Sequence, residues 1–241
     1  MALTLEVGGQ PLVLLPERAA FVPAASALLV ADAHFGKAQS FRRLGVPVPE
    51  ATTADNLRRL THLLAHTGAA HLVFLGDLMH ARDVHGAAAE EEVARWRAGH
   101  AALRITLVEG NHDAKAGAPP ARWGIERVPE PLLLGTLALR HHPQPEAGRY
   151  VLAGHLHPAA WVGRGVQRLR LPCFHFGAQV GVLPAFGSFT GMHPVQPQPG
   201  DRLFVAAEDA VRELPLGAAA GVRPARVRLA QSASRGPVGR A

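Results

Sequence analysis

The chain has 241 residues, of which 48% are hydrophobic and 18% are charged, and its formal net charge is +6. This composition excludes a generally disordered chain, and the length is enough to bury about 70% or more of the unfolded surface. The only cysteine, Cys173, excludes an intramolecular disulfide framework and favours the reducing cytoplasm.

Two further features predict a protein without membrane contact. No apolar segment is long enough to cross a bilayer. Residues 1–10 contain Glu6 and no basic residue, so they lack the charged start of a signal peptide.

Short aliphatic runs that end in polar residues predict buried strands in the first two thirds of the chain. There are five such runs: Ala27–Ala31, Leu72–Leu75, Ile105–Val108, Leu137–Leu139 and Val151–Ala153.

Helical patterns separate the first three of these strands. Four leucines share one face of the first helix, which Thr52 or Thr53 can cap and which ends near Gly68; they are Leu57, Leu60, Leu63 and Leu64. A second helix is predicted over about Ala87 to Ala101, with three glutamates in its early part, where they complement the helix dipole.

Beyond His157 the helical pattern fades, and apolar runs at Gln167–Leu171 and Leu203–Ala206 predict further strands. Pro194–Gly200 has the composition of a loop. The fold class is therefore α/β, with a second sheet packed on the first.

The C-terminal end differs in charge from the rest of the chain. Five of the 25 basic residues and none of the 19 acids lie after Leu216, which leaves a net charge of +1 on the preceding residues. We predict one domain over residues 1–215 and a basic, disordered tail over residues 216–241. The tail could attract phosphate backbones or could simply be a solvated terminus.

Side chains that can bind metal follow each of the five predicted strands. They are Asp32 and His34, Asp77 after Gly76, Asn111 to Asp113 after Gly110, His141, and His155 and His157 after Gly154. Each group alone is compatible with an ordinary turn. Ligands gather at the carboxyl ends of strands in open α/β sheets, so the whole set predicts one functional site.

This order of motifs resembles the calcineurin-like metallophosphoesterases, whose signature is D-x-H, G-D, G-N-H-D/E, a single His and G-H-x-H. Residues 32–45, 154–158 and 171–191 are most similar to a bacterial branch, the ligase-associated DNA damage response endonucleases (PdeM). The resemblance covers residues 1–215. It implies two packed mixed β-sheets flanked by helices, an αββα sandwich.

The resemblance also implies a site for two divalent metal ions. Its first metal would be held by Asp32, His34 and His157, its second by Asn111, His141 and His155, and Asp77 would bridge both. The branch has a His-x-Pro pattern, which favours His141 over His142 as the ligand. Mixed nitrogen and oxygen ligands suit Mn²⁺, Fe, Zn²⁺ or Co²⁺, and the resemblance favours Mn²⁺.

Two metals in such a site can generate a hydroxide that attacks phosphorus in line with the leaving oxygen. By resemblance, His112 assists the leaving group and Asp113 orients it; the alternative is that His112 is a surface loop residue. Lys37 and Arg82 are candidates for holding a substrate phosphate, although each could equally be a solvated or paired charge. Cys173 lies in an apolar stretch and is predicted to be a small buried residue.

We therefore predict a metal-dependent phosphodiesterase, acting as a nuclease in DNA repair with DNA as its substrate. By resemblance it would associate functionally with a DNA ligase, a helicase and an exonuclease. The alternative is a phosphatase or pyrophosphatase for a nucleotide or sugar-nucleotide. A non-catalytic scaffold is a third hypothesis, which the full set of expected ligands disfavours.

Overall fold

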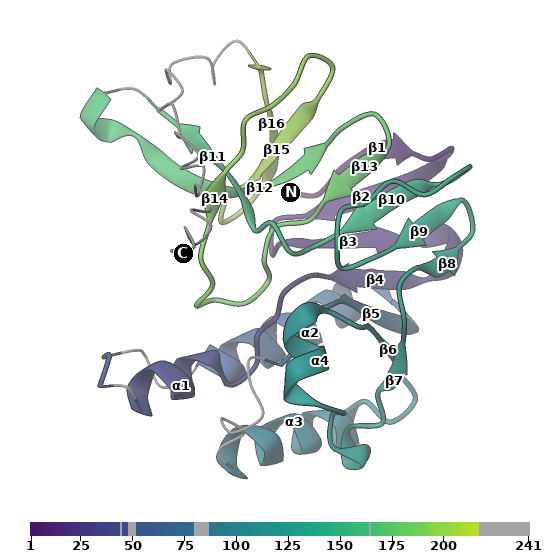
Figure 1. Cartoon of the computed structure of the whole chain (residues 1–241), viewed down its shortest axis with the longest axis vertical. Coiled ribbons are helices and arrows are strands. Elements are labelled where there is room, and N and C mark those ends of the chain that lie inside the picture. The colour runs from purple at the N-terminus through teal and green to yellow at the C-terminus, as the bar shows by residue number, and fades with distance from the viewer. Residues whose placement is uncertain (44, 48–51, 80–86, 164, 217–241) are drawn as a thin grey trace, which may run out of the picture.

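The structure is a computed structural model, and it describes residues 1–43, 45–47, 52–79, 87–163 and 165–216 (Figure 1). Arg82 and residues 217–241 of the predicted tail lie outside the described residues, and the domain boundary at residue 215 stays a prediction. None of the helices in the described ranges is long and apolar enough to span a membrane.

The first sheet holds the N-terminal half of the strands, in the order β1 to β7. Antiparallel pairing joins β1 (Leu3–Val7), β2 (Gln10–Leu15), β3 (Ala19–Val22) and β4 (Ala27–Val30). Parallel pairing joins β4 to β5 (His71–Leu75), β6 (Arg104–Val108) and β7 (Glu126–Val128). The carboxyl ends of β4, β5 and β6 therefore meet at one edge.

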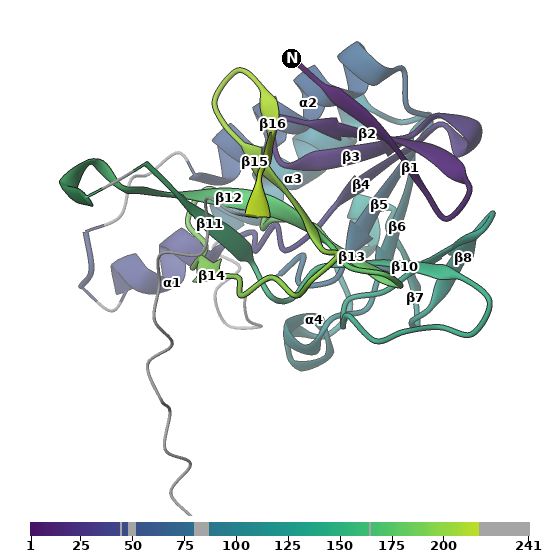
Figure 2. The same cartoon turned by 90° about the horizontal axis from the view of Figure 1, so that it is seen from above.

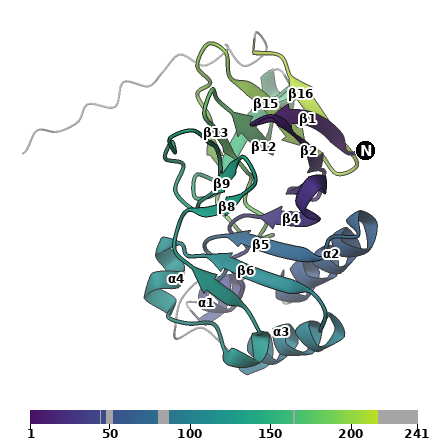
Figure 3. The same ribbon diagram turned by 90° about the vertical axis from the view of Figure 1, so that its right-hand side faces the viewer.

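Parallel strands require crossover connections, and helices provide them here. The α-helices are α1 (Lys37–Arg43), α2 (Thr52–Thr67), α3 (Ala87–Gly99) and α4 (Asn111–Ala116). The four predicted leucines of α2 are buried, and the second predicted helix ends at Gly99, two residues earlier than expected. Figure 3 shows α2 and α3 along the outer face of the first sheet.

The second sheet is also mixed and runs in the order β14-β11-β12-β13-β10-β9-β8, with β15 and β16 added beside β12. Its strands are β8 (Leu132–Leu134), β9 (Leu137–Leu139), β10 (Tyr150–Ala153), β11 (Pro158–Val162), β12 (Leu169–Phe176), β13 (Val180–Val182), β14 (His193–Pro194), β15 (Arg202–Ala206) and β16 (Val211–Leu214).

Two sequence-based boundaries in this half differ from the structure. Gln167 belongs to a 3₁₀ turn, and the strand begins at Leu169 and continues to Phe176. Pro194 is in the short strand β14, while the rest of the predicted loop lies outside any strand. The predicted α/β fold with two mixed sheets is confirmed. Helices α1 to α4 all lie between β4 and β7 in the chain, so they flank the first sheet.

The first sheet is covered on both faces, as its continuous apolar runs predict. In β4, Leu28 and Val30 pack toward α2, whereas Leu29 packs toward the second sheet. Cys173 on β12 is completely buried, as predicted, and burial raises the pKa of its thiol to about 12. The two sheets thus share one core, and the candidate site lies at their common edge.

Candidate metal centre

The loops that follow β4 and β5 run side by side at the carboxyl edge of the first sheet. The Asp32 amide donates to the carbonyl oxygen of Gly76 at 3.3 Å, and the His34 amide donates to that of Asp77 at 2.9 Å. These bonds bring the first two predicted motifs together. Asp32, His34 and Asp77 are all buried.

The backbone of the site is strained. Seven non-glycine residues in the described ranges have positive φ, and five of them are predicted metal ligands: Asp32, His34, Asp77, His155 and His157. Each such residue costs on the order of 1–3 kcal/mol and persists only where its surroundings hold it. The surrounding structure therefore holds these five residues in an unfavourable backbone conformation that directs their side chains into the site.

The first cluster contains Asp32, His34 and His157, with one ligand atom of each within 4.8 Å of the others. The His157 Nδ1–H donates to the carbonyl oxygen of Gly191 at 3.2 Å, so in the neutral ring Nε2 carries a lone pair. That nitrogen lies 3.4 Å from Asp32 Oδ1, a buried atom that makes no hydrogen bond within the described ranges.

The second cluster contains Asn111, His141 and His155, and it too has a histidine nitrogen with a free lone pair next to other ligand atoms. The His141 Nδ1–H donates to the carbonyl oxygen of Leu75 at 3.1 Å, which leaves a lone pair on Nε2 of the neutral ring. This nitrogen lies 2.9 Å from Asn111 Oδ1 and 3.0 Å from His155 Nδ1. Burial, together with His141 and His142, lowers the pKa of His155, which favours the neutral, metal-binding ring.

Asp77 lies between the two clusters. Its Oδ1 is 3.5 Å from His141 Nε2, and its Oδ2 is 3.8 Å from His34 Nε2. Asp32, Asp77 and His141 also form a group of their own within 4.8 Å. One carboxylate therefore faces both clusters, and its role as a bridging ligand stays a prediction.

These residues fit a pair of divalent cations. Lone pairs of His141 and His157 point at oxygen acceptors of Asn111 and Asp32, an arrangement that a cation stabilises and that protein hydrogen bonds alone do not. The second nitrogen of each ring donates to a backbone carbonyl, which is the support that metal-binding histidines ordinarily have.

Two glycines of the motifs are required for these close approaches. A Cβ on Gly154 would lie 2.6 Å from Asp32 Oδ2, and a Cβ on Gly76 would overlap the His141 ring. Gly76 also has φ +74°, which favours glycine. The glycines thus leave room for the side chains that converge on the site.

His112 and Asp113 lie in the first turn of the short helix α4 and differ in what they contact. The His112 amide donates to Asp77 Oδ1 at 2.9 Å, and its ring nitrogen Nε2 lies 3.9 Å from Asp77 Oδ2 with the side chain 36% exposed. The carboxylate of Asp113 accepts from the amides of Met79 and Gly110, both at 3.1 Å. Burial raises the pKa of Asp113 to about 6.

The contacts of Asp113 tie the loop after β5 to the start of α4. The orientation of His112 by Asp113 stays a prediction. The structure shows the carboxylate positioning the backbone on both sides of the site.

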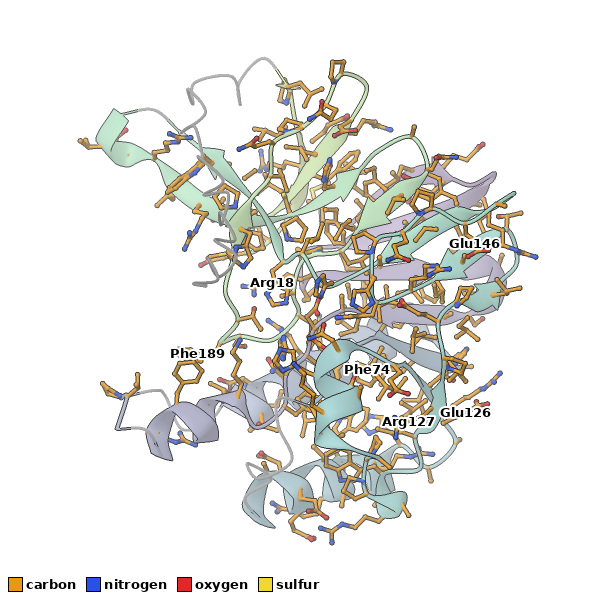
Figure 4. The ribbon with its side chains drawn as sticks, in the orientation of Figure 1. Arg18, Phe74, Glu126, Arg127, Glu146 and Phe189 are labelled. Carbon is orange, nitrogen blue, oxygen red and sulfur yellow. The ribbon has the colours of Figure 1, made fainter. Side chains whose placement is uncertain are left out.

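Lys37 lies at the first residue of α1 beside the first cluster. It lines a small hollow with His34 and Phe189, and burial lowers its pKa although Asp77 and Asp32 act in the opposite direction. Phe189, labelled in Figure 4 beside α1, packs edge-to-face on Phe41 with ring centroids 5.3 Å apart. The other substrate candidate, Arg82, lies outside the described residues.

Glu130 is a supporting residue that the sequence analysis missed. Its Oε2 accepts the amides of both His141 and His142, at 2.8 and 3.0 Å, and its Oε1 is 2.8 Å from His142 Nδ1. His142 joins His141 and His155 in a possible three-histidine group. Glu130 lies eleven residues before His141, and no local sequence pattern indicates that the two residues are in contact.

Comparison with solved structures identifies the family. The crystal structure of Pseudomonas putida nuclease MPE matches with a TM-score of 0.78 and 43% sequence identity, over 89% of this chain and 100% of that chain. The chain belongs to the calcineurin-like metallophosphoesterases. Yfce, a phosphoesterase from E. coli, also matches, at 16% identity and a TM-score of 0.43, over 78% of this chain and 97% of that chain.

No protein-family model matches the chain, and neither does any curated protein. The assignment to the metallophosphoesterases therefore depends on the Pseudomonas putida structure. The two-sheet α/β fold agrees with it.

Proposed function

We propose that this metallophosphoesterase is a metal-dependent phosphodiesterase that cleaves nucleic acid. The observation that carries the proposal is the position of Asp77, whose two carboxylate oxygens face the His141 cluster and the His34 cluster. The similarity to a nuclease over almost the whole chain supports nucleic acid as the substrate class.

The donor set supports two divalent cations, with Asp32, His34 and His157 around one, Asn111, His141 and His155 around the other, and Asp77 between them. When bound, such a pair neutralises phosphate oxygens and lowers the pKa of water. The mixed nitrogen and oxygen donors favour Mn²⁺, with Fe, Zn²⁺ or Co²⁺ as alternatives. In this proposal His142 is not a metal ligand. Its ring contacts Glu130, the carboxylate that accepts the backbone amide of His141.

His112 is proposed as the proton donor to the leaving oxygen. Its ring lies at the rim of the site, with its centroid 5.2 Å from that of His34, and is accessible to solvent. A positioned acid contributes ~10²–10⁴-fold to a rate. Asp113 acts through the backbone of α4, and Lys37, beside His34, is placed to contact a phosphate.

We further propose a role in DNA repair, in the cytoplasm, together with a DNA ligase, a helicase and an exonuclease. Support for this role comes from the branch resemblance, and the single cysteine agrees with a reducing compartment. Co-purification of the tagged protein with a DNA ligase is expected, and its absence in cells with DNA damage would argue against the association.

The test of the chemistry compares two small substrates in the presence of Mn²⁺. Hydrolysis of bis-p-nitrophenyl phosphate is expected to exceed that of mono-p-nitrophenyl phosphate. Asp77→Asn should lower the rate by ~10³-fold or more, because loss of several kcal/mol of charge stabilisation corresponds to this factor. His112→Ala should lower it by ~10²-fold or more.

Asp55→Asn is the matched control, since Asp55 lies on the exposed surface of α2 and should leave the rate unchanged. Equal rates for the wild type and Asp77→Asn would contradict the mechanism. A preference for the monoester would instead favour the phosphatase alternative.

A further inference from the structure

The hairpin formed by β11 and β12 starts directly at the metal centre. β11 begins at Pro158, the residue after His157, and pairs antiparallel with β12 through four residue pairs from Ala159↔Pro172 to Val162↔Leu169. Figures 1 and 2 both show this hairpin projecting from the same side of the molecule as α1. It therefore extends outward from the site as an arm.

The hairpin is positively charged, and its described arginines have no acidic partner among the described residues. Residues 158–171 include three arginines and no acid. Within the described ranges, no ion pair involves Arg168 or Arg170. By contrast, Arg104 on β6 is paired with Glu126, and Arg122 is paired with Glu90 of α3.

An aromatic ring holds these arginines in place. The Arg168 guanidinium lies 4.7 Å from the centroid of the Trp161 ring, and that of Arg170 lies 5.9 Å from it. Trp161 is paired directly with Arg170, so their side chains share a face of the hairpin. Stacking on an aromatic ring keeps the donor fork of arginine ordered while its N–H groups remain available to a phosphate.

A hollow lies beside the metal centre at the base of the hairpin. It has a volume of about 490 Å³ and is lined by residues that include His155 of the site and His193, Pro194 and Val195 beside β11. β14, which contains His193, is paired with β11. His175 also lines the hollow and alternates with Arg170 along β12, so the hollow adjoins the base of the hairpin on the face opposite to the arginines.

The distance between the metal centre and the arginines of the hairpin is suited to a polymeric substrate. Trp161 is four residues beyond His157, which corresponds to at most about 13 Å along a strand. This is roughly four base-pair steps of duplex DNA at about 3.4 Å each. A substrate must therefore be several nucleotides long to reach the hairpin and the metal centre together.

We propose that Arg168 and Arg170, ordered on Trp161, bind backbone phosphates of the nucleic acid whose scissile bond lies at the metal centre. This inference rests on the proposed nuclease function and identifies the surface that binds its substrate beyond the metal centre. Val166 and Leu169 are exposed on the same hairpin. The unpaired charge favours nucleic acid as the occupant over an apolar protein surface.

The experiment compares Arg168→Gln/Arg170→Gln with Arg104→Gln/Arg122→Gln, which removes the same charge from paired, exposed arginines. A third variant, Arg168→Lys/Arg170→Lys, keeps the charge and loses the planar fork. Binding of fluorescein-labelled 30-nucleotide DNA, single-stranded and duplex, is measured by anisotropy across a salt series. An Asp77→Asn background with Mn²⁺ prevents cleavage during the measurement.

The hairpin Gln variant should bind DNA roughly ten-fold or more weakly at 0.1 M salt, with a slope of log K against log salt reduced by about two. The Lys variant should keep the slope, and the control pair should match the background protein. Without Asp77→Asn, kcat/KM on DNA should fall through KM, while hydrolysis of bis-p-nitrophenyl phosphate stays unchanged because that diester cannot reach the hairpin.

Unchanged DNA affinity of the hairpin variant would overturn this inference and leave Val166 and Leu169 as a surface for a protein. An equal loss in the control pair would also overturn it, because the effect would then be one of net charge. Failure of the wild type to hydrolyse the small diester would instead contradict the proposed function, and the binding series would still decide whether the hairpin contacts DNA.

Discussion

The two sheets contribute different chemistry to the site. The first sheet provides all the oxygen donors of the predicted set, from Asp32, Asp77 and Asn111, together with His34. The second sheet provides only imidazole nitrogens, from His141, His155 and His157. Neither sheet holds a complete set for a pair of cations, so the site exists only where the sheets meet.

Hydrogen bonds between the two sheets also hold the predicted ligands in place. The amide of His155 donates to Asp32 Oδ2 at 2.9 Å, and His141 Nδ1–H donates to the carbonyl oxygen of Leu75 on β5. Packing of the sheets and assembly of the ligands are therefore one event. Disturbing one sheet at this edge should disturb the ligands of the other.

Gly154→Ala is the change expected to break this arrangement most severely. The added methyl group comes from the second sheet and would lie 2.6 Å from Oδ2 of Asp32, a predicted ligand that follows β4 of the first sheet. A displacement near 1 Å can cost about 10²-fold in rate, so hydrolysis of bis-p-nitrophenyl phosphate should fall by at least that factor. Elemental analysis should also find less bound Mn²⁺.

Gly99→Ala is the control, because its Cβ would meet nothing within 4 Å at the end of α3. Both variants should keep the circular dichroism spectrum of the wild type. Full activity and metal content in Gly154→Ala would show that the two sheets tolerate separation at the site.

Glu130→Ala should have a smaller effect, confined to the ligands of the second sheet. Without the carboxylate, the backbone of His141 and His142 loses its acceptor. Loss of such a supporting group typically lowers metal affinity by 10–100-fold. A Mn²⁺ titration followed by activity should show this shift.

Glu126→Ala removes an exposed ion pair with Arg104 and should leave the titration unchanged. If Glu130→Ala also left it unchanged, the hydrogen bonds of Glu130 would be irrelevant to the metal centre.

The smallest expected effect concerns Tyr150, which lies on β10 of the second sheet and is the only tyrosine of the chain. Burial raises its pKa to about 12, with Asp201 contributing, and its hydroxyl donates to the carbonyl oxygen of Gly177 at 2.7 Å. The folded state therefore favours the neutral phenol. Its contribution to stability is present below about pH 10 and is lost as the pH rises through 12.

Absorbance at 295 nm reports this ionisation directly. The midpoint should lie near pH 12 in the folded protein and near the ordinary value of about 10 in denaturant. A folded midpoint near 10 would contradict the burial of Tyr150 in the second sheet. Enzymatic activity near neutral pH should be unaffected.

The strands that were easiest to predict are those with both faces buried. The run from Ala27 to Ala31 closely matches β4, because a strand between two apolar layers has no polar alternation to confuse its pattern. The antiparallel strands β1 to β3 were not singled out. Gln167 was placed in a strand because a short apolar run does not show where a turn ends and a strand begins.

Within the candidate site, the sequence predicted which side chains converge, and it did not predict the groups that support them. The motifs around Asp77 and Asn111 are local in sequence, so their spacing is visible without a structure. Glu130 acts across eleven positions, and Asp113 contacts the amide of Met79, 34 positions earlier. Such contacts have no periodic signature, because they depend on how loops pack.

The sequence alone determined the order of the strands that end in metal-binding residues and the chemical kind of each ligand, since both are written in short local patterns. Only the tertiary structure decided which ligand atoms face one another, how Glu130 and Asp113 support them, and that the β11–β12 hairpin extends from the site. These features depend on distances between segments far apart in the chain, and packing of the two sheets sets those distances.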